Sequence, residues 1–485
     1  SLRCNLLPDI FDVFDIIQFI VKVNTQYKYN LNLLKNNSLK KLIILLIDGI
    51  LNKTGINYEK YIIPLLSITI RLLIMNCSEI DENFINLLMD KIISDNYNLL
   101  VTLTLELYHL NTDVNNEQKI KFCNIVSNYI KCKLSPSQKN IIARTVEVIK
   151  TLDKTKNIDD VKNMLPIIYP FDTNYVITDI TSIIVLDSNS KPIMIDMLIK
   201  KTTSMKNSYS NINENDSAQL KEKRRMIIKK DAYLRKENIV SSIIMLLQEK
   251  LITQANKKRL DKFEPIPTYK ILMITDSIGV IEFINESITL RKIASKKFTL
   301  QNYVLEHNRE TEVGKVKDRF IKSLAISSCL SYVLGLGDRH LDNIMINKKG
   351  QIFHIDYGYL MENPITNIFG YPVIRVTGEM VEFLGGQNSK YYDEFKKYII
   401  NVFDIVRLYD NIILDYYFIL GHENIINWEI FKNKIMNRFM NGMSCKDVEI
   451  NLISEIETST NSYSGMVTDI FHDYGSTIKS YFGSA

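Results

Sequence analysis

Glycine and proline are scarce in this sequence, with 17 and 10 among 485 residues, while 46% are apolar and 24% are charged. This is the composition of a soluble globular protein. The six cysteines form no CxxC pair and no cluster with histidine, which argues against a disulfide framework or a zinc site and favours a reducing compartment. The formal net charge of +5 is small for this length, so we expect no nucleic-acid partner, which would require a concentrated basic face.

No stretch of the sequence predicts a membrane span. The most apolar one, residues 61–77, is short and contains Pro64 and Arg71, so we interpret it as a buried helix. No signal peptide is visible, and the sequence does not begin with methionine. We therefore expect a cytoplasmic protein whose membrane contacts are peripheral, at membrane surfaces.

The length predicts two or three domains. In residues 1–165 apolar side chains recur at helical spacing, as in 39–50 and 122–130, and Ser135-Pro136-Ser137-Gln138 has the residues of a helix start with a capping box. Residues 166–285 are rich in predicted strands and contain a polar, Ser- and Asn-rich insertion near 200–223. Residues 286–485 are mainly helical. We predict strands at 175–177, 182–186, 226–229, 270–275 and 280–284.

The most informative stretch lies between residues 335 and 358. A long apolar helix, Phe320–Leu334, leads into the loop GLGDRHLDN, and two short strands joined by the turn NKKG lead to HIDYG. Phosphoryl transfer needs an acid or base beside the attacking hydroxyl and Mg²⁺ ions held by oxygen ligands.

Three polar residues of this stretch fit that chemistry. Asp338 and Asn343 have the separation of the Asp and Asn in a protein-kinase catalytic loop, and Asp356 stands in the place of the D-F-G metal ligand. The hairpin between them should bring Asn343 and Asp356 side by side, as two Mg²⁺ ligands must be.

The sequence GDRHLDNIM followed by HIDYG resembles the signatures GDRHxxN and HIDFG of phosphatidylinositol 3-/4-kinases and the related giant protein kinases. The resemblance implies a bilobal kinase fold of the α+β class, with a β-rich N-lobe and a mainly helical C-lobe, preceded by an all-α accessory domain. It implies ATP and Mg²⁺ (or Mn²⁺) as cofactors. By the same resemblance, Asp338 and His340 assist transfer, Asn343 and Asp356 bind metal, and His354 is a further catalytic candidate. Tyr357 replaces the usual Phe, a change in a packing residue.

Two further matches lie upstream. Residues 228–237, IKKDAYLRKE, resemble the family's KxxDDLRxD segment, which implies that Lys229 is the ATP-phosphate lysine and Glu237 its carboxylate partner. Residues 277–284 resemble the G-L-I-E hinge, whose adenine-pocket residues here are Ile281, Glu282, Phe283 and Ile284. The phosphate loop should lie near Thr178–Ser182, with Thr181 and Ser182 as its candidate residues, although the lysine and serine pair often found there are missing.

The segment from Tyr357 to Thr377 should meet the acceptor, and it carries only Glu362 and Arg375 as charges. An inositol that already carries phosphates would require more cations, so the segment favours unphosphorylated phosphatidylinositol in a membrane surface. Its apolar side chains could contact the bilayer interface or pack in the core: Ile365, Ile368, Phe369, Tyr371 and Val373. Residues 375–386, RVTGEMVEFLGG, are similar to the corresponding segment of the lipid kinases.

Three functions remain open at this stage. The first is a phosphatidylinositol 3- or 4-kinase, with a possible regulatory protein bound through the helical domain. The second is a Ser/Thr protein kinase of the same superfamily. The third is a catalytically degenerate kinase-fold scaffold, suggested by the altered lysine segment and phosphate loop.

Overall fold

The computed structural model describes residues 82–93, 100, 101, 104, 117–186, 188, 190–201, 221–258, 263–275, 277–296, 298–361, 372–411, 413, 414, 417 and 427–460. The helices expected at 39–50 and 61–77 lie outside the described residues, as does most of the polar insertion expected near 200–223.

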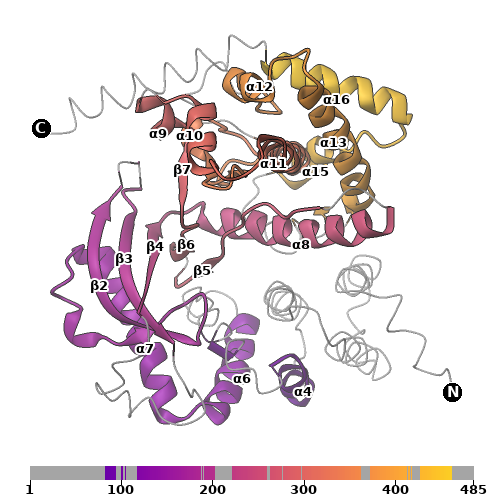
Figure 1. Ribbon diagram of the computed structural model, residues 1–485. Coiled ribbons are helices and arrows are strands. Elements are labelled where there is room, and N and C mark those ends of the chain that lie inside the picture. The colour runs from indigo at the N-terminus through magenta and orange to yellow at the C-terminus, as the bar shows by residue number, and fades with distance from the viewer. Residues whose placement is uncertain are drawn as a thin grey trace, which may run out of the picture. The chain divides into compact units, whose positions relative to one another are not determined.

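The described residues form two compact units. The first comprises the described residues up to Asn238, Tyr269–Phe283 and Tyr417, and the second comprises the described residues of Ile239–Thr268 and Ile284–Leu414 and those from Asn427 onward. Both units combine helices with antiparallel strands, as the α+β class requires (Figure 1). No helix among the described ranges is both long and apolar enough to cross a membrane.

The first unit contains a six-stranded sheet (Figure 1). Its order is β1-β2-β3-β4-β6-β5 and every neighbouring pair is antiparallel; the strands are β1 (Ile167–Ile168), β2 (Tyr175–Val185), β3 (Ile193–Lys201), β4 (Glu222–Lys230), β5 (Ile271–Met273) and β6 (Ile278–Glu282). The structure has a single strand β2 where the sequence predicted two. Register shifts after Ile177 and Ile180 allow one continuous strand to change the side that each residue faces.

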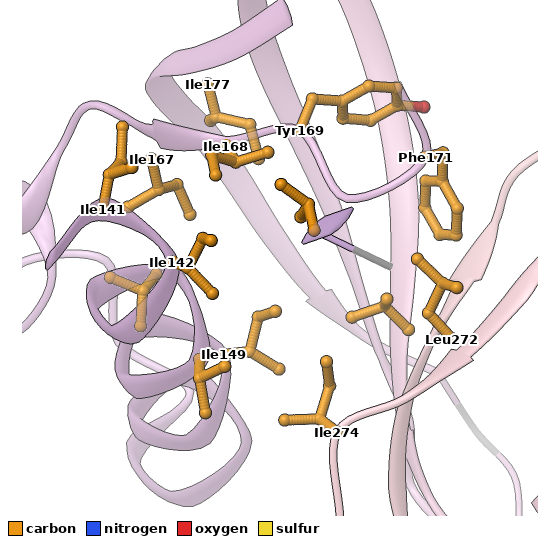
Figure 2. Close-up of a cluster of buried hydrophobic side chains, with 14 of the residues drawn as sticks. Ile141, Ile142, Ile149, Ile167, Ile168, Tyr169, Phe171, Ile177, Leu272 and Ile274 are labelled. Atoms are coloured by element: carbon orange, nitrogen blue, oxygen red, sulfur yellow. The ribbon is translucent and has the colours of Figure 1, made fainter. Parts of the chain in front are cut away.

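One face of this sheet shares a hydrophobic core with helices that precede it in the chain. Helix α7 (Pro136–Thr155) packs on β1 and β4, and α6 (Glu117–Lys133) and α4 (Glu82–Ile93) extend the core. In β3 the burial alternates, with Ile193, Ile195, Met197 and Ile199 facing this core. Figure 2 shows α7 contributing Ile141, Ile142 and Ile149 and β1 contributing Ile167 and Ile168. The helices before residue 165 and the strands after it therefore share one core, and the domain boundary placed there stays a prediction.

Helix α7 begins as its sequence predicts. Pro136 is its first residue, the Ser135 side chain accepts the Gln138 N–H, and the Gln138 side chain accepts the Ser135 N–H, which completes a capping box. The buried Thr145 of α7 accepts the main-chain N–H of Ile168 at 3.1 Å, which fixes β1 on the helix.

The second unit is built around helix α11 (Val313–Leu334), in which every residue from Phe320 to Leu334 is buried. The other helices are α8 (Leu234–Lys258, whose first turn belongs to the first unit), α9 (Leu290–Ser295), α10 (Leu300–His307), α12 (Gly378–Leu384), α13 (Lys390–Val406), α15 (Trp428–Arg438) and α16 (Cys445–Thr460). A three-stranded sheet of order β7-β8-β9 consists of β7 (Ser287–Thr289), β8 (Ile344–Asn347) and β9 (Ile352–His354). The helix predicted at 320–334 is confirmed and begins seven residues earlier.

Two serines of α11 fix the β8–β9 hairpin on the helix. The Ser323 hydroxyl accepts the N–H of Ile352, and the Ser327 hydroxyl donates to the carbonyl oxygen of the same residue, each at 3.0 Å. Both serines are buried, so these two bonds satisfy polar groups that would otherwise lack partners in the core. They set the position of β9, which leads directly to Asp356.

Candidate active site

Helix α11 ends at a glycine that the turn requires. Gly335 has a φ of 72°, in the left-handed region, and a Cβ atom there would lie 2.9 Å from the Met361 side chain. The chain then reverses, because the N–H of Leu336 returns to the Ser331 carbonyl oxygen at 3.0 Å. This turn directs residues 337–340 away from the helix and into the 3₁₀ helix η4 (Leu341–Asn343), which precedes β8.

The hairpin brings Asn343 and Asp356 together, as the sequence predicted. Ile344 lies opposite His354 in the ladder, and the N–H of Ile355 donates to the carbonyl oxygen of Asn343 at 3.1 Å. Asp356 directly follows Ile355, so this hydrogen bond holds the main chain of Asp356 close to that of Asn343. The Asn343 side chain is 7% exposed, and its Nδ2 donates to the carbonyl oxygen of Asp338 at 2.9 Å. The hairpin thus joins Asn343 to Asp356, and the Asn343 side chain joins both to the main chain of Asp338.

Arg339 is a residue of this site that the sequence analysis missed. Its side chain is only 1% exposed, although it is charged. Nε donates to the Gly337 carbonyl oxygen and Nη1 to that of Ile355, each at 2.7 Å, and Nη2 donates to the carbonyl oxygen of Asp356. The guanidinium therefore ties the loop of Asp338 to the main chain at Asp356. We call these three hydrogen bonds the Arg339 clamp. The sequence shows only a single arginine within the signature and does not indicate that its side chain is buried, so the clamp could not be predicted.

Asp338 and Asp356 both have left-handed backbone conformations, with φ angles of 55° and 56°. Such conformations are uncommon for residues with a Cβ atom, although Asp and Asn tolerate them better than most. Strained residues of this kind concentrate at functional sites, where the surrounding contacts hold them in place. The Arg339 clamp and the β8–β9 hairpin supply those contacts here.

His340 lies between two carboxylates and is 8% exposed. Its Nδ1 accepts the N–H of Asp342 at 3.2 Å. Nε2 lies 3.6 Å from Oδ2 of Asp338 and 3.1 Å from Nδ2 of Asn343. The structure therefore brings together Asp338 and His340, the two residues expected to assist transfer.

His354 lies apart from this group, inside the fold. It is 3% exposed, and neither of its ring nitrogens has a hydrogen-bond partner among the described residues. Burial, with a smaller contribution from the Arg339 charge, lowers the pKa of His354 to about 3, so its ring is neutral near pH 7. The neighbouring Tyr357 is buried and donates its hydroxyl to the His354 carbonyl oxygen at 2.6 Å. These surroundings give no support to acid–base work by His354, and its catalytic role stays a prediction.

The low pKa of His354 predicts a loss of stability in mild acid. Between about pH 6.5 and pH 3 the unfolded chain binds a proton at this residue that the folded chain does not, so the free energy of unfolding falls as the pH falls. From pH 7.5 to 5.5 this residue should cost about 1 kcal/mol. We expect His354→Leu to remove that part of the pH dependence of the unfolding free energy, measured by urea denaturation. His307 is an exposed histidine of α10, and the control substitution His307→Gln should leave that part in place. Equal pH dependence in wild type and His354→Leu would contradict this prediction.

In the first unit, Lys229 lies at the centre of a polar cluster. Its Nζ lies 3.3 Å from Oε2 of Glu237 and 3.3 Å from Oδ2 of Asp231, and the side chain of Glu237 is almost fully buried. Tyr269 donates its hydroxyl to the other oxygen of Glu237 at 3.0 Å. The structure thus joins the expected Lys229–Glu237 pair and adds Asp231 and Tyr269. The sequence could have indicated the contact with Asp231, because this acidic residue lies only two positions after Lys229.

The sheet face that carries Lys229 is largely apolar. Residues directly opposite each other in antiparallel strands share a face. Ile227 lies opposite both Ile281 and Met194, Met194 lies opposite Ile184, and all of them share the face of Lys229. We call this set the Lys229 face: Ile184, Met194, Ile227, Lys229 and Ile281. Of its apolar members, the sequence had indicated only Ile281.

The other hinge candidates occupy different positions. Glu282 lies opposite Met226, which is on the core face, and its side chain accepts the N–H of Lys270 at 3.2 Å. Burial raises the pKa of Glu282. Phe283 follows the last residue of β6, and Ile284 accepts a hydrogen bond from the Ser287 hydroxyl through its carbonyl oxygen. The Glu282 side chain is therefore directed away from the Lys229 face.

Comparison with known proteins identifies this part of the chain. Residues 223–430 match the family model described as phosphatidylinositol 3- and 4-kinase. The chain carries a domain of the phosphatidylinositol 3-/4-kinase superfamily. The matched residues include the Lys229 cluster and the whole hairpin site.

Curated relatives agree with this identification. The chain is 28% identical over 357 residues to phosphatidylinositol 3-kinase VPS34 of Saccharomyces cerevisiae, covering 70% of this chain and 37% of that protein. It is 28% identical over 267 residues to phosphatidylinositol 3-kinase pik3 of Schizosaccharomyces pombe, covering 53% and 32%. It is 31% identical over 210 residues to phosphatidylinositol 3-kinase VPS34 of Arabidopsis thaliana, covering 41% and 24%. The chain spans roughly a quarter to a third of the length of these relatives.

The loop expected in this kinase domain at Thr178–Ser182 is a strand. Thr181 and Ser182 lie inside β2, before the residues matched by the family model. The Thr181 hydroxyl donates to the carbonyl oxygen of Asp196 at 3.2 Å, and the Ser182 hydroxyl donates to Oδ2 of the same residue at 2.7 Å. Ser182 pairs with Asp196 in the ladder, whereas Thr181 lies at a register shift within the strand, so a contact of either residue with phosphate stays a prediction. The register shifts in β2 misled the prediction, because they make the strand read as interrupted.

The described part of the acceptor segment begins and ends in buried structure. Residues 362–371, which contain Glu362, Ile365, Ile368, Phe369 and Tyr371, lie outside the described residues. Arg375 is 4% exposed, so it belongs to the interior of the second unit. The next residue, Val376, exchanges two hydrogen bonds with the Ser459 hydroxyl, which accepts the Val376 N–H at 2.8 Å and donates to its carbonyl oxygen at 3.2 Å. Helix α16 therefore holds the end of this segment.

Proposed function

We propose that this chain is a phosphatidylinositol 3-kinase, which transfers the γ-phosphoryl group of ATP to the inositol ring with Mg²⁺ or Mn²⁺ as cofactor. The observation that carries the proposal is the joining of Asp338, Asn343 and Asp356 by one hairpin and one buried arginine. The names of the relatives support the 3-hydroxyl of the ring as the acceptor.

Asn343 and Asp356 would hold the metal. Both present oxygen atoms, which Mg²⁺ prefers, and Mg²⁺ is commonly bound by one or two protein ligands together with phosphate oxygens. The Asn343 amide donates to the Asp338 carbonyl oxygen through Nδ2, so its Oδ1 is the atom suited to a cation. A divalent cation there would supply positive charge against the charge that develops on the transferring phosphoryl group.

Asp338 and His340 would act on the acceptor hydroxyl. The Asp338 carboxylate accepts the proton of the attacking hydroxyl, which strengthens the oxygen as a nucleophile. His340 orients that carboxylate, because its Nε2 faces Oδ2 of Asp338. The main chain of Asp338 is fixed in turn by the Asn343 side chain.

The first unit would bind the nucleotide. Lys229, oriented by Asp231 and Glu237, contacts the phosphates as a point charge. Ile184, Met194, Ile227 and Ile281 provide an apolar surface for the adenine, and the main chain of Glu282–Ile284 provides its polar contacts. In this proposal residues 166–285 are the N-lobe and residues 286–485 the C-lobe of a bilobal kinase, behind a helical accessory domain formed by residues 1–165.

The acceptor in this proposal is phosphatidylinositol in a membrane surface facing the cytoplasm, which the protein meets peripherally. A regulatory protein binding through the helical domain is part of the same proposal. The acceptor is tested by offering Mg·ATP with phosphatidylinositol vesicles, with vesicles of phosphatidylinositol 4-phosphate, and with a basic protein. The proposal predicts phosphorylation of the first alone, at the 3-hydroxyl. Phosphorylation of the protein instead would make this a protein kinase.

Replacing Lys229 by methionine should weaken nucleotide binding. The loss of a charged contact to phosphate is expected to raise the Kd of Mg·ATP by about 10- to 100-fold. The matched control is Lys230→Met. Lys230 is exposed, and this substitution removes the same charge from the adjacent position. Titration calorimetry of both variants checks the prediction, with circular dichroism to establish folding. A folded Lys229→Met variant that binds Mg·ATP as tightly as Lys230→Met would remove Lys229 from the nucleotide site.

A further inference from the structure

A chain of polar side chains crosses the sheet on the same side as the Lys229 face, and no role assigned above uses these side chains. The Ser182 hydroxyl donates to Oδ2 of Asp196 at 2.7 Å, and Nε of Arg225 donates to Oδ1 of the same carboxylate at 2.6 Å. The Arg225 guanidinium then lies over the ring of Phe283, with 5.0 Å between its central carbon and the ring centroid. Four side chains from β2, β3, β4 and the end of β6 are thus connected in a row.

The strand register places the side chains of this row directly opposite one another. Ser182 lies opposite Asp196, and Asp196 lies opposite Arg225, so each polar group faces its partner across one strand spacing. Arg225 precedes Met226, which lies opposite Glu282, and Phe283 directly follows Glu282. The hydrogen bond from Arg225, together with the bond from Ser182 and the Arg225 charge, lowers the pKa of Asp196.

The position of Arg225 separates it from the phosphate end of the nucleotide site. Arg225 and Lys229 lie on the same face of β4, four residues apart, which corresponds to about 13 Å along a strand. Lys229 marks the phosphates in the proposed function, so Arg225 lies at the end where the hinge meets the base. Phe283 is the first residue of that hinge beyond β6.

We propose that Arg225 is a positioning residue for the adenine: its guanidinium, held by Asp196, fixes Phe283 and with it the hinge main chain that binds the base. The inference rests on the proposed function and assigns a role in binding the base to a residue outside the lysine segment, 228–237, and the hinge segment, 277–284. The cation–π contact and the partly exposed ion pair each have a modest interaction energy. Arg225 therefore adds to base affinity by holding the hinge in its binding conformation before the nucleotide arrives.

The test separates base affinity from phosphate affinity in the full chain. The Kd values of Mg·ATP and of Mg·tripolyphosphate, which lacks the base, are measured by calorimetry for wild type, Arg225→Met and Arg224→Met. Arg224 is the matched control, because it is the adjacent arginine, alternates to the other face, and pairs with Glu222. We expect Arg225→Met to weaken Mg·ATP by about 5- to 20-fold and to leave Mg·tripolyphosphate unchanged. Arg224→Met should match wild type for both.

Each other outcome overturns the inference. Unchanged Mg·ATP binding by Arg225→Met would show that the arginine does not position the base. Equal weakening of both ligands would show a general structural role. A wild-type chain that binds neither ligand would overturn the proposed function together with the inference, whereas normal wild-type binding with an unaffected Arg225→Met variant overturns the inference alone.

Discussion

Replacing Asp356 by asparagine is expected to lower kcat for phosphoryl transfer by at least about 10³-fold while the protein stays folded. The substitution removes the negative charge that would hold the metal against the phosphates, and several kcal/mol of transition-state stabilisation depend on that metal. Asparagine is the right replacement because Asp356 has a φ of 56°, which asparagine tolerates and alanine does not. Steady-state kinetics with saturating Mg·ATP measure the effect.

The control for this variant is Asp393→Asn. Asp393 is an exposed residue in the first turn of α13, where it pairs with Lys396, so the same chemical change occurs outside the loops of the site. We expect Asp393→Asn to keep wild-type kcat. An Asp356→Asn variant that is folded and retains more than about a tenth of wild-type kcat would show that this carboxylate does not hold a catalytic metal.

Arg339→Met should both destabilise the protein and loosen the metal site. The substitution leaves the carbonyl oxygens of Gly337, Ile355 and Asp356 without their donor, which should cost about 2–5 kcal/mol of unfolding free energy. In the fraction that stays folded, Asp338 and Asp356 lose the guanidinium link between them and keep only the link through Asn343. We therefore expect a higher Mg²⁺ concentration for half-maximal rate, in addition to a lower kcat.

Two comparisons separate positioning from stability. Arg319→Met removes an α11 arginine that donates to the Lys349 carbonyl oxygen at 2.9 Å, and it should leave the Mg²⁺ dependence unchanged. Arg339→Lys keeps the charge, but an ammonium cannot span three carbonyl oxygens as a planar guanidinium does, so it should not restore the wild-type Mg²⁺ dependence. If Arg339→Met lowers only the amount of folded protein, with an unchanged Mg²⁺ requirement, the clamp has no part in positioning Asp356.

The sequence predicted the elements whose pattern is local. The helix before Gly335, the hairpin that follows and the capping box at Ser135 each depend on residues within a few positions of one another, and the structure contains all three. The proximity of Asn343 and Asp356 was also predictable, because a two-stranded hairpin with a short turn places its ends together.

The features that the sequence did not predict depend on partners distant in the chain. Arg339 is buried because carbonyl oxygens from two segments, 2 and 16–17 residues away, converge on it. The exclusion of His354 from solvent depends on its packing inside the second unit. Met194 joins the Lys229 face through a ladder between β3 and β4, which lie on either side of the insertion near 200–223. Such contacts follow from the tertiary fold, and no local pattern encodes them.

The most direct test of the account is transfer of labelled γ-phosphate from Mg·ATP to phosphatidylinositol vesicles by the full chain, with Asp356→Asn in parallel. The account predicts labelled phosphatidylinositol 3-phosphate with the wild type, none after the metal is chelated, and at most about a thousandth of the rate with Asp356→Asn. A wild-type chain that binds Mg·ATP but places no label in the lipid, or an Asp356→Asn variant that labels it at the wild-type rate, would contradict the account.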